Sequence, residues 1–275
     1  MKPKLIALDL DETTLNTEGC LSPANRTAIY QAITRGIQIV VATGRPISTV
    51  PEEIKNFSGI RYVIAGNGAA IYDLSENKTI LRKTLLEEAV RKILELTADE
   101  ALTYEAFING VAYAQKDYVQ NPTIYMDGER HTDYVQATRH PVENIRTFIL
   151  EHQAELDSLD LVVQDFDTKK RMAKELGTLK NIYITTSTPP LLEISHKDCG
   201  KHRGLQFLTE LLGINRNETV AFGNADNDAE MLQWAEVGVA VKNASSRCLA
   251  AADYITDESW NDGVAHAFQK LLYIY

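Results

Sequence analysis

The sequence has few cysteines, no long hydrophobic run and no excess of positive charge. Three cysteines, Cys20, Cys199 and Cys248, lie far apart in 275 residues and lack the spacing of a metal site. This pattern predicts reduced thiols, as in a cytoplasmic protein. No hydrophobic stretch is long enough to cross a bilayer or resembles a signal peptide at the amino terminus. We therefore expect a cytoplasmic protein that has no membrane partner.

The charge balance argues against binding to nucleic acid. The chain has 28 Lys and Arg against 38 Asp and Glu, for a net charge of −10. Proteins bind phosphate backbones through an excess of Lys and Arg. A phosphorylated ligand must therefore be bound at a local positive site. The sequence leaves the oligomeric state open, and we expect a monomer or a weak dimer.

The first hydrophobic run ends in two acids. Residues 4–8 show no alternation, which is typical of a parallel strand buried on both faces. Asp9 and Asp11 follow, and ligands of parallel sheets bind outside the carboxyl ends of the strands. An aspartate can attack phosphorus, and a second carboxylate can transfer protons. Two anions beside a phosphate require a divalent cation. Taken alone, the pair fits a solvated acidic loop equally well.

Three later segments place polar groups at comparable points. Thr43-Gly44-Arg45 follows the expected strand 37–42, and Lys201 begins an expected helix that ends at Leu212. Asn224 to Asp228 follow the expected strand 219–222. If these strands are parallel neighbours, all of these groups converge on one edge. A carboxylate, hydroxyl and amide donors, an ammonium and metal-binding oxygens are the groups that phosphoryl transfer requires.

The spacing of the elements predicts two domains. Strands alternate with helices in residues 1–82 and 187–275, which favours an α/β core with a doubly wound, mostly parallel sheet of the Rossmann-like type. Residues 83–186 combine helices with antiparallel hairpin signals, such as the one around Asn109-Gly110. We expect this segment to form an inserted α+β domain.

The order of the motifs resembles the haloacid dehalogenase-like hydrolase superfamily, and in particular its Cof-type, class IIB phosphatases. The matching segments are Asp9-Leu10-Asp11-Glu12-Thr13, Thr43-Gly44-Arg45, Asn67-Gly68-Ala69, Lys201-His202-Arg203-Gly204 and Gly223-Asn224-Ala225-Asp226-Asn227-Asp228 with Met231. The resemblance covers both ends of the chain and leaves the middle as a cap domain of suitable length.

The resemblance implies a Mg²⁺-dependent hydrolase of small phosphate monoesters such as sugar phosphates. Asp9 would be the nucleophile, Asp11 the general acid and base, and Lys201 a catalytic cation. The implied phosphate-binding groups are the Leu10 amide, Thr43, Gly44, Lys201 and Asn227. The implied Mg²⁺ site contains Asp9, the Asp11 carbonyl and Asn224, with Asp228 supporting the metal or Lys201. Arg45 would contact the substrate or tie the edge of the sheet together.

Two residues depart from the family pattern. Glu12 stands where the family usually has glycine, and Asn224 stands where it usually has a metal-binding aspartate. A carboxamide oxygen can bind Mg²⁺ but carries no charge. We hypothesise weaker metal affinity than in relatives, or a shift of the direct metal contact to Asp228.

Three alternatives remain at the level of sequence. A phosphoryl receiver module also combines acids, a threonine and a lysine at strand ends, but it is shorter and has no large insertion. A catalytically weakened relative that only binds a phosphorylated ligand is favoured by Asn224 alone. A nucleotide-sugar transferase could use the two acids, but it would leave Lys201 and Thr43-Gly44-Arg45 without a role.

Overall fold

The computed structural model describes residues 3–125 and 129–272. The chain forms two compact units. The first contains the residues up to Gly44, Val50–Ile80 and the residues from Gly200 onward. The second contains Arg45–Thr49 and Leu81–Cys199. In the described residues, no helix combines the length and the hydrophobicity needed to cross a membrane.

The first unit is built on an eight-stranded sheet of order β14-β13-β12-β1-β2-β3-β4-β5. Neighbouring strands from β14 to β3 are parallel, and β4 pairs antiparallel with β3 through the predicted hairpin. The doubly wound, mostly parallel α/β fold is thus confirmed. The strands are β1 (Leu5–Leu8), β2 (Gln38–Ala42), β3 (Ile60–Ala65), β4 (Ala70–Asp73), β5 (Lys78–Arg82), β12 (Thr219–Gly223), β13 (Val237–Ala240) and β14 (Tyr254–Ile255).

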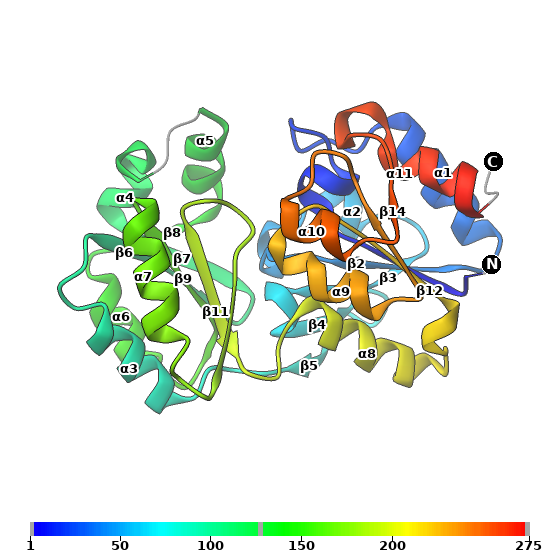
Figure 1. The fold of residues 1–275 in the computed structure, drawn as a ribbon. Helices are drawn as coiled ribbons and strands as arrows, with labels where there is room; N and C mark the ends of the chain where they lie inside the picture. Colours follow the sequence, from blue (N-terminus) through cyan, green and yellow to red (C-terminus); the bar gives the residue numbers. More distant parts are fainter. Residues whose placement is uncertain (1–2, 126–128, 273–275) are drawn as a thin grey trace. The chain divides into compact units, whose positions relative to one another are not determined.

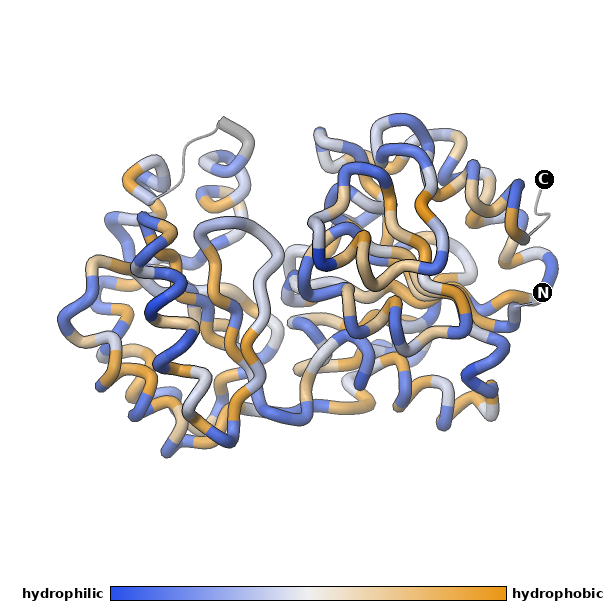
Figure 2. The backbone as a smooth tube through the Cα atoms, viewed as in Figure 1, coloured by the Kyte–Doolittle hydropathy of each residue, from blue (hydrophilic) through white to orange (hydrophobic). Residues whose placement is uncertain are grey.

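Helices cover both faces of this sheet. Helices α1 and α11 lie together on one face, while α8 and α9 pack on the other (Figure 1). Hydrophobic residues gather in the strands and hydrophilic residues in the loops (Figure 2). Ser22 caps α1 by accepting a hydrogen bond from the Asn25 amide, with Pro23 at the first helical position. The helices are α1 (Pro23–Thr34), α2 (Glu52–Lys55), α8 (Lys201–Leu212), α9 (Ala229–Trp234), α10 (Ser246–Ala251) and α11 (Gly263–Leu272).

The second unit has its own six-stranded sheet, of order β10-β11-β9-β6-β7-β8. Alternate residues of its strands enter a hydrophobic core together with residues of α3, α6 and α7, and this core includes Tyr104, Leu159, Leu161 and Ile194. The strands are β6 (Leu102–Ile108), β7 (Val111–Gln115), β8 (His140–Val142), β9 (Leu156–Val163), β10 (Ile182–Thr185) and β11 (Leu191–His196). The helices are α3 (Glu87–Leu96), α4 (Lys116–Gln120), α5 (Glu129–Thr138), α6 (Ile145–Glu151) and α7 (Phe166–Leu176).

The division of the chain differs from the expected one at its second boundary. The second unit extends to Cys199, whereas we placed the boundary near 186. The reason is that β11 pairs antiparallel with β9, so residues 187–199 belong to the six-stranded sheet. The pairing partner of a strand is a long-range property that its own residues do not reveal. Residues 45–49 also group with the second unit. The role of this unit as a cap stays a prediction.

Helix α8 lies close to β3 because Gly204 has no side chain. A Cβ atom at Gly204 would lie 2.5 Å from Cγ2 of Ile64. We expect Gly204→Ala to lower the free energy of unfolding by about 1 kcal/mol or more, since overpacking outweighs the gain in helix propensity. In the double variant with Ile64→Ala, the loss should be smaller than the sum of the two single losses. Urea denaturation measures all three variants, and strictly additive losses would contradict this packing.

Candidate active site

The carboxyl ends of three neighbouring strands meet at one edge of the first sheet. In the parallel register, Leu8 of β1 lies beside Phe222 of β12 and beside Val41 of β2. The Asp9 amide donates a hydrogen bond to the Phe222 carbonyl at 3.1 Å. Asp9 and Thr43 therefore leave the sheet at the same edge, next to the turn that follows β12. The predicted convergence of these motifs is present in the structure.

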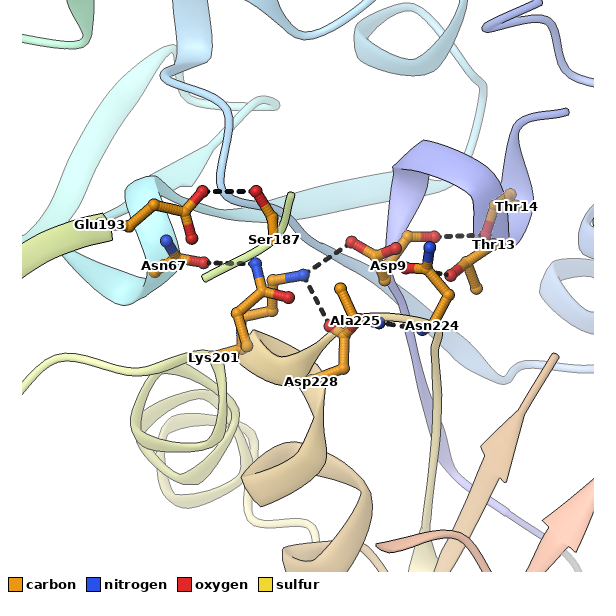
Figure 3. Close-up of polar contacts among 11 residues, drawn as sticks. Asp9, Thr13, Thr14, Asn67, Ser187, Glu193, Lys201, Asn224, Ala225 and Asp228 are labelled. Carbon is orange, nitrogen blue, oxygen red and sulfur yellow. Dashed lines mark hydrogen bonds and ion pairs between the residues drawn. The ribbon is translucent and has the colours of Figure 1, made fainter. Parts of the chain in front are cut away.

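A lysine joins two acids at this edge. The Lys201 ammonium, at the start of α8, lies 2.6 Å from Oδ1 of Asp9 and 2.6 Å from Oδ1 of Asp228 (Figure 3). All three residues are at most 4% exposed. Burial and the nearby Asp228 raise the pKa of Asp9 to about 7, although Lys201 acts to lower it. Burial disfavours the charge of Lys201, yet Asp228 and Asp9 raise its pKa above the ordinary value. Lys201 is thus a buried, permanently charged ammonium.

Both oxygens of Asp228 are engaged. Its Oδ2 accepts hydrogen bonds from the Asn224 and Ala225 amides, at 3.0 Å each, while Oδ1 contacts Lys201. Gly223 makes this turn possible, because a Cβ atom there would lie 2.4 Å from the Asp228 Cβ. The geometry favours the supporting role for Asp228, toward Lys201 and the turn, over the shifted metal contact that we considered.

Oxygen atoms that could hold Mg²⁺ lie beside this network. Oδ2 of Asp9 is buried and has no hydrogen-bond partner in the part of the chain that the structure describes. Oδ1 of Asn224 accepts a hydrogen bond from the Thr13 hydroxyl at 3.2 Å (Figure 3). Residues 3–125 and 129–272 contain no group of three or more His, Cys, Asp or Glu side chains that could hold a metal. The carboxylate oxygen of Asp9 and the carboxamide oxygen of Asn224 are of the kind that Mg²⁺ prefers.

The loop after Asp9 has a strained backbone that its neighbours hold in place. Glu12 has φ of +54°, a left-handed conformation that favours glycine, the residue usual in the family. Its carbonyl accepts a hydrogen bond from the Asn243 side chain at 3.0 Å. The Thr14 hydroxyl donates to the Asp9 carbonyl, and Asn25 donates to the Thr14 carbonyl. These hydrogen bonds fix the backbone of the loop that carries Asp11. The Glu12 side chain is exposed.

Asn67 is a site residue that sequence reasoning missed. Its Oδ1 accepts a hydrogen bond from Asn227 at 3.0 Å, and its amide donates to the Thr43 carbonyl at 3.0 Å. Gly68 lies so close to the start of α8 that a Cβ atom would be 2.4 Å from the Gly200 carbonyl oxygen. The Asn-Gly pair was interpreted as a hairpin turn and as one of the matching family segments, without a role in the site. In the structure, Asn67 has a left-handed φ of +52°.

The remaining predicted residues have simpler surroundings. Leu10 and Thr43 are buried, and Gly44 is partly buried at the end of β2. Arg45 belongs to the segment that groups with the second unit. Its guanidinium donates to the Thr49 carbonyl and lies 4.8 Å from the centre of the Tyr134 ring. Its role toward a substrate stays a prediction.

A sequence profile identifies the family of the chain. The profile of haloacid dehalogenase-like hydrolases matches residues 6–268. The chain belongs to the haloacid dehalogenase-like hydrolase family. The family resemblance expected from the motifs is therefore confirmed.

Relatives of this hydrolase include proteins that are named phosphatases. It is 29% identical over 266 residues to 5-amino-6-(5-phospho-D-ribitylamino)uracil phosphatase YcsE of Bacillus subtilis, covering 97% of this chain and 94% of the relative. It is also 29% identical over 285 residues to phosphatase YwpJ of the same organism, covering 98% of this chain and all of the relative. The predicted enzyme class, a phosphatase, is confirmed by these relatives.

Solved structures share the fold over almost the whole hydrolase. A haloacid dehalogenase-like hydrolase from B. subtilis has a TM-score of 0.84 and 27% identity, covering 98% of this chain and 99% of the other. A sugar phosphatase of subclass IIB has a TM-score of 0.82 at 20% identity, covering 97% and 98%. The second likeness concerns the fold alone.

The Lys201 contacts predict a large stability effect. We expect Lys201→Met to lower the free energy of unfolding by about 3–5 kcal/mol, because two buried carboxylates would lose their shared cation. Adding Asp9→Asn and Asp228→Asn should recover most of that loss by removing the repulsion. Urea denaturation in metal-free buffer at pH 8 measures both variants. A Lys201→Met variant as stable as the wild type would mean that the three charges are not coupled.

Proposed function

We propose that this hydrolase is a Mg²⁺-dependent phosphatase that acts on small phosphate monoesters through a phosphorylated Asp9. The observation that carries the proposal is the Lys201 ammonium bound to both Asp9 and Asp228 at 2.6 Å. It holds the nucleophile in one orientation and places positive charge where a phosphate must bind. The names of the phosphatase relatives support the same activity.

The residues account for two displacement steps. Asp9 attacks phosphorus through a carboxylate oxygen while the ester P–O bond breaks, and Asp11 gives its proton to the leaving oxygen. A water molecule then attacks the phosphorus, Asp11 takes a proton from it, and the bond from phosphorus to Asp9 breaks. Inorganic phosphate leaves and Asp9 is restored. Lys201, Thr43, Asn227 and the backbone amides of Leu10 and Gly44 would bind the phosphate oxygens.

The Mg²⁺ ion would be held by Asp9, the Asp11 carbonyl and Asn224, with Asp228 in support. When bound, it neutralises charge between the phosphate and the acids, which is its usual contribution in phosphoryl transfer. The unpartnered oxygen of Asp9 and the carboxamide oxygen of Asn224 support this assignment. With a neutral ligand in place of an aspartate, the site would bind the ion less tightly than an all-carboxylate site.

The second unit would act as a cap that excludes water and selects the leaving group. The expected substrates are sugar phosphates and related phosphorylated metabolites, and a cytoplasmic location fits such substrates. The relative YcsE is named for a phosphorylated ribitylamino-uracil, a small metabolite of this kind. Arg45 would contact the substrate from the segment that groups with this unit.

One observation favours a second candidate function, a catalytically weakened protein that binds a phosphorylated ligand. Asn224 removes one metal-binding charge, and the described residues contain no group of three acidic, histidine or cysteine side chains suited to a metal. Such a protein would bind phosphate esters at the same edge without multiple turnovers. Phosphate release with Mg²⁺ present separates the two functions.

The nucleophile can be tested by a matched substitution. We expect Asp9→Asn to reduce phosphate release by at least about a thousandfold, because the amide cannot attack phosphorus. The fold should persist, since the amide keeps the shape of the carboxylate. Turnover of p-nitrophenyl phosphate with Mg²⁺ and circular dichroism measure the two properties, with the exposed Glu151→Gln as the control. A variant that keeps most of its rate would exclude Asp9 as the nucleophile.

The Asn224 departure can be tested in the same assay. We expect Asn224→Asp to lower the Mg²⁺ concentration at half-saturation by about tenfold, because an anionic ligand binds the ion more strongly. Asn224→Ala removes the ligand oxygen and should therefore raise that concentration. Turnover measured against Mg²⁺ concentration decides the matter. An unchanged half-saturation in Asn224→Asp would show that this side chain does not contact the ion.

A further inference from the structure

One face of the second sheet carries three buried carboxylates in a row. In the strand register, Glu193 of β11 lies opposite Asp160 of β9, and Asp160 lies opposite Glu105 of β6. Directly opposed residues on neighbouring strands have Cβ atoms about 4.5–5.5 Å apart. None of the three residues is more than 6% exposed. We call Glu105, Asp160 and Glu193 the carboxylate row.

The row lies on the face opposite to the hydrophobic core of the second unit. The residues that alternate with it, such as Tyr104, Leu159, Leu161 and Ile194, enter that core. Polar residues on the face of the row include Thr185, which lies opposite Glu193 in the register of β10 and β11. Three adjacent buried carboxylates need hydrogen-bond or ion-pair partners, because burying an unpaired charge costs free energy.

Partners are present at the two ends of the row. The Arg139 guanidinium lies 2.5 Å from Oε2 of Glu105, and the Tyr118 hydroxyl donates to the same carboxylate. Arg139 thus pairs directly with Glu105, and its charge also acts on Asp160 without a direct hydrogen bond. Glu193 accepts a hydrogen bond from the Ser187 hydroxyl at 2.6 Å (Figure 3). His131, which contacts Tyr118, supplies no further charge at neutral pH because burial lowers its pKa.

The middle of the row lacks such partners. The Asp160 carboxylate has no hydrogen bond from the described side chains, and its neighbours across the two strands are both carboxylates. Burial, together with Glu193 and Glu105, raises the pKa of Asp160 well above its ordinary value, although Arg139 acts to lower it. Within the same ranges, the Thr185 hydroxyl is also buried without a partner, in a residue only 5% exposed. A buried hydroxyl is nearly always satisfied, so the Thr185 hydroxyl beside this row of acids points to a bound molecule that completes it.

We propose that the carboxylate row binds the protonated amine of a small ligand at Asp160, with Glu193 and the Thr185 hydroxyl as further acceptors. An ammonium has three N–H donors and one positive charge. It satisfies the two unpartnered groups and offsets the surplus of acid, whereas a neutral polyol would leave that charge uncompensated. The inference rests on the proposed function, in which the amine belongs to the leaving group of a phosphate ester. A free amine has the same chemistry and is the second source to test.

The binding step is balanced in charge and protons. Burial and the two neighbouring carboxylates favour the protonated form of Asp160, because they raise its pKa. Binding of R–NH₃⁺ to the carboxylate favours release of such a proton to solvent, so that one cation replaces the other. Heat measured in buffers of different ionisation enthalpy therefore reports proton release upon binding.

A matched pair of esters, D-glucosamine 6-phosphate and D-glucose 6-phosphate, tests whether the bound amine belongs to the substrate. We expect the kcat/KM of the wild type to be at least tenfold higher for the amino ester. Asp160→Asn should bring that ratio close to one, and Thr185→Val should lower it partially. The exposed Glu151→Gln on α6 is the control and should keep the wild-type ratio. Equal kcat/KM values for the two esters in the wild type would show that the bound amine does not belong to the substrate.

Calorimetry on the full chain tests whether the row binds a free amine, by comparing the binding of D-glucosamine with that of D-glucose. Binding of the amine alone, with proton release and an Asp160→Asn loss of at least tenfold, supports a site for a free amine. If neither the ester pair nor the free pair shows an amine preference that depends on Asp160, the proposal is wrong. No phosphate release from any ester would instead refute the proposed function, and binding of the two esters would still test the row.

A stability measurement shows that the variants are folded. The raised pKa of Asp160 means that its contribution to stability is present below the ordinary aspartate pKa of about 4 and is lost as pH rises toward the folded-state value. Asp160→Asn should therefore unfold at a urea concentration no lower than that of the wild type at pH 8. It should not gain this advantage at pH 4. An Asp160→Asn variant less stable than the wild type at pH 8 would mean that Asp160 is already paired, which overturns the proposal.

Discussion

The first unit depends on one buried ammonium placed between two buried carboxylates. Asp9, Lys201 and Asp228 come from the end of β1, the start of α8 and the turn before α9. None of the three charges is stable alone in this environment, because each has left water. Their mutual attraction joins segments separated by almost two hundred residues. Any displacement of these elements would separate the charges, so the interaction also fixes the geometry of the edge.

Backbone features let these charges approach so closely. Gly223 and Gly68 leave room where a Cβ atom would collide with Asp228 or with the Gly200 carbonyl. Glu12 and Asn67 take left-handed conformations that neighbouring hydrogen bonds stabilise. The turn amides that bind Asp228 complete the arrangement without a ligand. The carboxylate row of the second unit differs, because its central acid, Asp160, lies between two other carboxylates.

Much of this arrangement was predictable from local patterns. The strands that carry the motifs and the helix beginning at Lys201 lie where their hydrophobic runs and capping residues placed them. The short elements β5, α4 and α10 were not predicted, since five or six residues show too little periodicity. The boundary near 186 was wrong because β11 finds its partner β9 across the second sheet. Asn67 was assigned to a turn, since its contact with Asn227 joins residues far apart in the chain.

The sequence alone determined the family, the doubly wound core and the residue types at the ends of its strands, because hydrophobic periodicity and motif spacing are local properties. Only the tertiary structure decided which contacts each of these residues makes. It placed both oxygens of Asp228 in hydrogen bonds and ion pairs, and it aligned Glu105, Asp160 and Glu193 across three strands. Among the residues that the structure describes, it left one oxygen of Asp9 without a partner. These outcomes depend on strand register and on close approach between distant segments, which no local pattern encodes.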